Sequence, residues 1–120
     1  MPPSDYRRRM ARDASSDHAE LAARLRDRVL TSGALDPTLR AQALERGVAG
    51  TRMPEPYRAL ALQVGDASSR VTDAQVAAVR DALGSDVETF ELVLSAAIGA
   101  GLRRWTAAGR AIEKARGATP

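Results

Sequence analysis

Residues 91–105 read ELVLSAAIGAGLRRW, and this stretch decides the fold. From Leu92 to Leu102 the only polar side chain is Ser95, and two arginines then precede the single tryptophan of the chain. A helix that is apolar on nearly every face has to be surrounded by other parts of the protein. The stretch therefore predicts a central helix, covered on one side by its own domain and on another by a second subunit.

The same helix extends beyond this stretch, from Asp86 to about Ala115. One face combines Val87, Phe90, Leu94, Gly101, Trp105, Ala108 and Ile112, and a second face combines Val93, Ala96, Ala97 and Ala100. Glycine inside a helix costs about 1 kcal/mol relative to alanine, so Gly99 and Gly101 are expected where another backbone comes close. The long helix is accordingly the expected surface of a homo-oligomer.

Composition favours an all-α fold. The chain has 120 residues, enough for one domain, and is 44% hydrophobic but only 3% aromatic. A core of Ala, Leu, Val and Ile suits close helix packing better than sheets. We predict about five helices, in a single domain at residues 15–117 with a short C-terminal tail at residues 118–120.

The rarest residue types exclude several kinds of chemistry. The chain holds no cysteine and one histidine, so it offers no thiolate metal site, no thiol nucleophile and no histidine cluster. We predict neither a metal nor a cofactor. The longest apolar run would span about half a bilayer core as a helix, and the N-terminus MPPSDYRRRM lacks a signal sequence's apolar stretch. We expect a cytoplasmic protein without a membrane partner.

The first half of the chain predicts shorter elements. Residues 1–14 lack apolar periodicity and are expected to form a flexible basic tail. Ser15 or Ser16 then caps a helix that ends near residue 32, with an apolar stripe of Leu21, Leu25 and Val29. A second helix runs from Asp36-Pro37 to Arg46, a loop covers residues 48–53, and a third helix runs from Pro54 to Gly65.

Two capping boxes predict a helical hairpin. Thr72 is followed by Gln75 three residues later, and Ser85 by Glu88, with Gly84 between the two signals. A helix from Asp73 to Leu83 is therefore expected to turn sharply and pack antiparallel to the long helix.

The segment VTDAQVAAVRDALGSDVETFELVLSAAIGAGLRRW, from Val71 to Trp105, resembles the second half of the alkylhydroperoxidase-like, or carboxymuconolactone decarboxylase-like, helical fold. In that family a capped helix of this form precedes a short turn and a long alanine-rich helix. The upstream segment LDPTLRAQALERGVAGTRMPEPYRAL resembles the family more loosely. The resemblance implies an all-α bundle that assembles through its long helices.

The same resemblance argues against redox activity. Redox members carry C-x-x-C, a histidine four residues beyond and a glutamate some three turns earlier. The matching positions here lie near Glu55, Arg58, Leu62 and Ala43, so the peroxidase motif is absent. Peroxidase chemistry needs a thiolate nucleophile. The expected function is an oligomeric interaction or small-ligand-binding module; the alternative is a cysteine-free, decarboxylase-like enzyme acting on a small carboxylate or lactone.

Several polar residues are candidates for a ligand pocket. Arg103, Arg104 and Trp105 could bind a small organic anion, with Tyr57 and Glu91 as polar partners. The favoured interpretation is nevertheless that Trp105 lies in the core and that the arginines pair with acids or water. His18, the only imidazole, could be a general acid or base, but an exposed histidine is the favoured interpretation.

Nucleic acid is a further alternative partner. Arg7, Arg8, Arg9 and Arg12 could contact phosphates weakly, as basic arms do. A separate helix-turn-helix interpretation of the hairpin from Thr72 to Ala97 is disfavoured, because the helix after Gly84 opens with acidic side chains that phosphates would repel. No aromatic residues are interleaved with the four arginines, and no second basic cluster accompanies them. A solvated tail is therefore the favoured interpretation.

Overall fold

The computed structural model describes residues 3–45 and 52–117, without the side chains of residues 3–4 and 11–15. Every regular element in this part of the chain is helical, which confirms the predicted all-α class. The elements are α1 (Pro3–Thr31), α2 (Pro37–Leu44), α3 (Tyr57–Ala67), the 3-10 turn η2 (Ser68–Arg70), α4 (Asp73–Leu83) and α5 (Asp86–Gly117).

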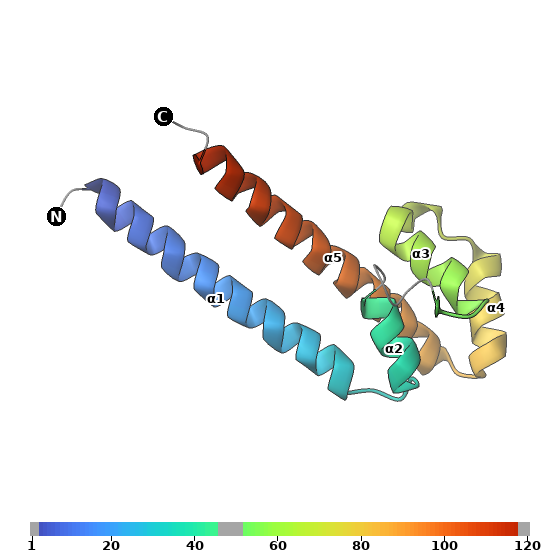
Figure 1. Cartoon of the computed structure of the whole chain (residues 1–120). Helices are drawn as coiled ribbons and strands as arrows, with labels where there is room; N and C mark the ends of the chain where they lie inside the picture. The colour runs from blue at the N-terminus through green and yellow to red at the C-terminus, as the bar shows by residue number, and fades with distance from the viewer. Residues whose placement is uncertain (1–2, 46–51, 118–120) are drawn as a thin grey trace.

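The helices form a packed group at one end of an elongated molecule. In Figure 1, α2, α3 and α4 gather around the first half of α5, while the first half of α1 and the second half of α5 extend away from them. The principal extents are 61 × 26 × 23 Å. Within the described residues no helix is both long and apolar enough to cross a membrane.

The core is small and aliphatic, as the composition predicts. It joins the buried face of α5 to α3, to α4 and to the segment around α2. Its fully or nearly fully buried members are Leu35, Ala43, Met53, Leu60, Ala61, Val64, Val79, Leu92 and Ala96.

The α4–α5 hairpin follows the local signals in the sequence. The Thr72 hydroxyl accepts a hydrogen bond from the Gln75 backbone N–H at 3.1 Å, and the Gln75 side chain accepts one from the Thr72 N–H at 3.0 Å. Gly84 ends α4 in the left-handed region with φ of 70°, where L side chains are strained. The Ser85 hydroxyl then accepts from the Glu88 N–H at 3.2 Å. The predicted hairpin and the bounds of α4 are confirmed.

The first helix differs most from its prediction. α1 begins at Pro3 instead of residue 16, so residues 3–14, predicted as a tail, are helical. Proline is tolerated in a first helical turn, Asp5 lies near the positive end of the helix dipole, and Arg, Met and Ala are strong helix formers. These local preferences can form a helix over residues 3–14 even though this segment has no apolar stripe. Leu21 and Leu25, predicted to be buried, are 55% and 44% exposed.

The other predicted helix bounds either lie close to the observed ones or fall on residues that the structure does not describe. α2 ends at Leu44, two residues before the expected end, and α3 begins at Tyr57 instead of Pro54. The Asp36 carboxylate accepts from the Thr38 N–H at 2.8 Å, which confirms the predicted cap. Arg46, where α2 was expected to end, most of the loop at 48–53 and the tail at 118–120 lie outside the described residues.

Candidate functional site

The long helix α5 has one buried and one exposed face. Its buried residues are Thr89, Leu92, Ser95, Ala96, Gly99 and Ala100. On the opposite side its large apolar side chains are between 43% and 64% exposed, with exposed small residues among them. We call this set the exposed stripe: Val87, Phe90, Leu94, Ala97, Gly101, Trp105, Ala108 and Ile112. The described part of the chain therefore covers α5 mainly on the side opposite the exposed stripe.

The two interior glycines of α5 have different surroundings. A Cβ atom on Gly99 would lie 2.1 Å from the carbonyl oxygen of Leu44, so the backbone of α2 approaches α5 at this point. A Cβ atom on Gly101 would meet nothing within 4 Å. The predicted close approach is thus confirmed for Gly99, whereas nothing in the described chain accounts for Gly101.

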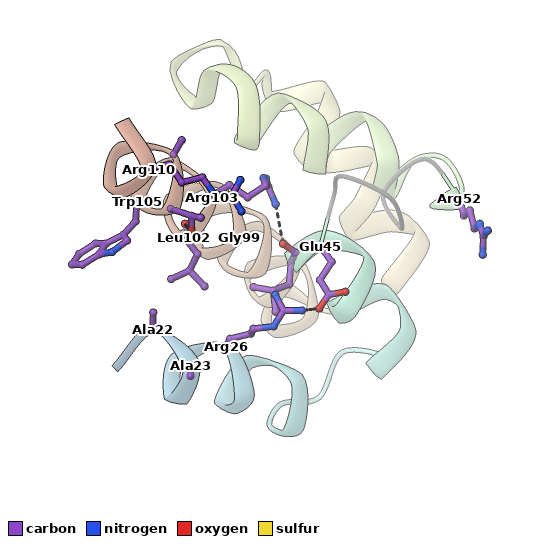
Figure 2. A pocket seen from close by; sticks show the side chains of 13 residues that line it. Ala22, Ala23, Arg26, Glu45, Arg52, Gly99, Leu102, Arg103, Trp105 and Arg110 are labelled. Atoms are coloured by element: carbon purple, nitrogen blue, oxygen red, sulfur yellow. Dashed lines mark hydrogen bonds and ion pairs between the residues drawn. The ribbon is translucent and has the colours of Figure 1, made fainter. Parts of the chain in front are cut away.

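A hollow of about 780 Å³ lies between α1, the end of α2 and the second half of α5. In Figure 2, Ala22 and Ala23 of α1 face Leu102 and Trp105 of α5 across it. Opposite Leu102 and Trp105, α1 presents only the small side chains of Ala22 and Ala23, which leaves the space between the two helices open. Its volume is in the range of small-molecule sites in proteins.

Arginines dominate the polar lining of this hollow. Arg26, Arg52, Arg103 and Arg110 line it, and Glu45 is the one acid in the part of the lining that the structure describes. Arg26 forms an ion pair with Glu45, and Arg103 Nη1 donates to the Leu44 carbonyl oxygen at 3.0 Å (Figure 2). The hollow is therefore positively charged over an apolar floor.

Trp105 contradicts the favoured interpretation that placed it in the core. Its surface is 52% exposed, and it lies at the edge between the hollow and the exposed stripe. The His18 ring of α1 meets the indole edge to face, with ring centroids 5.0 Å apart and planes at 89°. His18 is itself exposed, as the favoured interpretation had it.

The candidate pocket residues do not form one site. Arg103 and Trp105 share the hollow, but Arg104 points to α3, where its Nη2 donates to the Gly65 carbonyl oxygen at 2.5 Å beside a smaller recess of about 280 Å³. Tyr57 packs against the hydrophobic core at the start of α3. Arg26 and Arg110 were missed, although the separation of seven residues between Arg103 and Arg110 places both on one helix face.

Glu91 lies outside the hollow and holds the connection between α1 and α2. Its two carboxylate oxygens accept from the backbone N–H groups of Ala34 at 3.0 Å and Leu35 at 2.7 Å. These two hydrogen bonds, with the charge of Arg40, lower the Glu91 pKa against the opposing effect of burial. Glu91 thus holds backbone groups of the connection between α1 and α2, and it does not line the hollow with Trp105, as the pocket interpretation required.

Arg7, Arg8 and Arg9 are exposed on the first turns of α1, and the side chain of Arg12 lies outside the described residues. No group of three or more His, Asp and Glu side chains in the described ranges could hold a metal ion. Comparison with protein families, with curated proteins and with solved structures gave no match.

Proposed function

We propose that this protein is a non-redox helical interaction module that pairs with a second copy of itself through the exposed stripe of α5. The observation that carries the proposal is the stripe itself. Apolar residues recur every three or four positions along the helix from Val87 to Ile112, on the side away from the core. A continuous apolar surface on a small soluble domain is typical of a protein interface.

The charge distribution along α5 supports an antiparallel pair. Residues 86–101 include three acids and no base, whereas residues 102–117 include five bases and one acid. Antiparallel pairing places the acidic half of each helix beside the basic half of the other, and it also opposes the two helix dipoles. Gly101, near the middle of the stripe, then allows the two backbones to approach closely.

The resemblance to the alkylhydroperoxidase-like fold supports the non-redox part of the proposal. By this resemblance one thiol position of the redox members falls near Glu55, whose carboxylate accepts from the Ala59 N–H at 3.0 Å at the start of α3. A cap of this kind stabilises the helix terminus. We expect a thiol-dependent peroxide reductase assay to give only background rates, and robust turnover by the purified protein would contradict this.

Substituting Leu94 with glutamate tests the pairing. Leu94 is 43% exposed in the single chain, so the Leu94→Glu chain is expected to fold normally while its charge disrupts a buried interface. Light scattering at micromolar concentration should give twice the 12.8 kDa chain mass for the parent protein and the single mass for the variant. Ala78→Glu adds the same charge to the exposed side of α4 and should leave the pair intact. A parent protein of 12.8 kDa would refute the proposal.

Introduced cysteines test the antiparallel direction, because the chain has none of its own. A mixture of Val87→Cys and Ile112→Cys chains should form a mixed disulfide, since opposite ends of the stripe meet in an antiparallel pair. Each variant alone should remain largely reduced. Efficient disulfide formation by either variant alone would indicate a parallel pair instead.

A further inference from the structure

We propose that the hollow between α1 and α5 binds a small organic carboxylate, whose charged group contacts Arg103 and Arg110 while its apolar body contacts Leu102 and Trp105. This ligand site shares only Trp105 with the exposed stripe that is proposed to pair two α5 helices.

The described lining of the hollow carries more positive than negative charge. Among the described residues that line it, four are arginines and one, Glu45, is an acid whose charge is already paired with Arg26. Arg110 has no carboxylate or carbonyl partner among the residues that the structure describes. Like charges on one side of a helix repel each other, and a bound anion would relieve that repulsion. The hollow is therefore suited to an anion.

The apolar floor determines what kind of anion fits. Ala22, Leu44, Leu102 and Ala107 provide aliphatic surface, and Trp105 adds part of an indole. A fully hydrated inorganic anion gains no binding free energy from such a surface. A carboxylate with a hydrocarbon body does, because its apolar surface is removed from water there. Guanidinium groups bind carboxylates through paired N–H donors.

Two of these groups, Arg103 and Trp105, have contacts within the protein that hold them in place before a ligand binds. Arg103 is held by its hydrogen bond to the Leu44 carbonyl oxygen, and the Trp105 ring is held against His18 of α1. Figure 2 shows Arg103 and Arg110 on the same part of α5, with Leu102 toward α1. Preorganised side chains lose less conformational entropy when a ligand binds.

The sole tryptophan gives a direct measurement. We expect octanoate to change the Trp105 emission in a saturable way, whereas octanamide, which has the same body and no charge, should bind at least about tenfold more weakly. Inorganic phosphate should cause no saturable change. Isothermal titration calorimetry checks the same three compounds independently of fluorescence. Equal binding of acid and amide, equal binding of phosphate, or no octanoate binding by either method at millimolar concentration would each overturn the proposal.

Two pairs of variants locate the site. Arg110→Gln should weaken octanoate binding about tenfold, and Arg70→Gln, which removes an arginine from η2 outside the hollow, should not. Ala23→Glu adds a carboxylate to the wall of the hollow and should abolish binding, whereas Ala19→Glu, one turn earlier on α1, should not. Equal effects within either pair would contradict the assignment.

The Leu94→Glu chain separates this proposal from the pairing of α5. Leu94 does not line the hollow, so the variant should bind octanoate with the parent affinity even where it no longer pairs. Loss of binding in this otherwise folded variant would show that the carboxylate binds at the interface between two chains and not in the hollow.

Discussion

Replacing Gly99 with alanine is expected to destabilise the protein by about 3 kcal/mol, the upper part of the range for overpacking a core. The new Cβ atom would lie 2.1 Å from the Leu44 carbonyl oxygen and 2.8 Å from its carbonyl carbon. These are backbone atoms, so no side-chain rotation can relieve the overlap, and α2 has to move away from α5. The movement would also break the hydrogen bond from Arg103 to the same carbonyl oxygen. Urea unfolding followed by circular dichroism measures the loss.

Gly101→Ala is the matched control, two residues further along the same helix. Apart from its own helix, no described part of the chain lies within 4 Å of the position of its Cβ atom, so alanine should stabilise the helix by about 1 kcal/mol. Both glycine variants are best compared in Leu94→Glu chains, in which pairing does not contribute to stability. A Gly99→Ala chain as stable as its parent would contradict the close approach of α2 and α5.

Replacing Glu91 with glutamine is expected to cost about 2–3 kcal/mol of stability at neutral pH. The carboxylate accepts two backbone hydrogen bonds, from Ala34 and Leu35, and lies near the buried Arg40. A glutamine side chain turns one of these oxygens into an N–H donor that faces a backbone N–H. It also leaves the Arg40 charge without its carboxylate, which is costly for a buried group.

The pH dependence of stability identifies the ionised carboxylate as the cause. The folded protein holds the Glu91 pKa below its ordinary value of 4.5, so the unfolded chain takes up this proton first as the pH falls. The contribution of Glu91 is therefore complete above about pH 4.5 and is lost as the pH falls below that value toward the folded pKa. The stability difference between parent and Glu91→Gln should shrink over this acidic range. Glu113→Gln, on the exposed end of α5, should cost little at any pH. A difference that stays constant with pH would exclude this explanation.

The sequence predicts well those features that depend on neighbouring residues. Thr72 and Gln75 form the capping box at the start of α4, and Gly84 ends this helix in the left-handed region, as their spacing indicates. Such signals act within one helical turn, so one sequence is sufficient to recognise them. The all-α class can also be predicted from the sequence, because it follows from the composition and from the long apolar stretch.

Features that depend on how distant helices lie against each other were harder to predict. Glu91 binds backbone groups 56 and 57 residues away, and no periodic pattern records that contact. The burial of Trp105 depends on the distance between α1 and α5, and the small side chains of Ala22 and Ala23 leave that space open. Helical periodicity gives the face on which a residue lies, but not whether anything covers that face.

The helix α1 is supported by neighbours mainly at its C-terminal end. Val29 and Leu30 are partly buried and Arg40 donates to the Ser32 carbonyl oxygen, whereas residues 5–10 are fully on the surface. A helix supported in this way should open progressively from its free end without unfolding the rest of the protein. Amide hydrogens near Arg9 should consequently exchange with deuterium much faster than those near Leu30, and a helix-breaking change at Arg8 should lower the helix content while leaving the unfolding transition of α2–α5 in place.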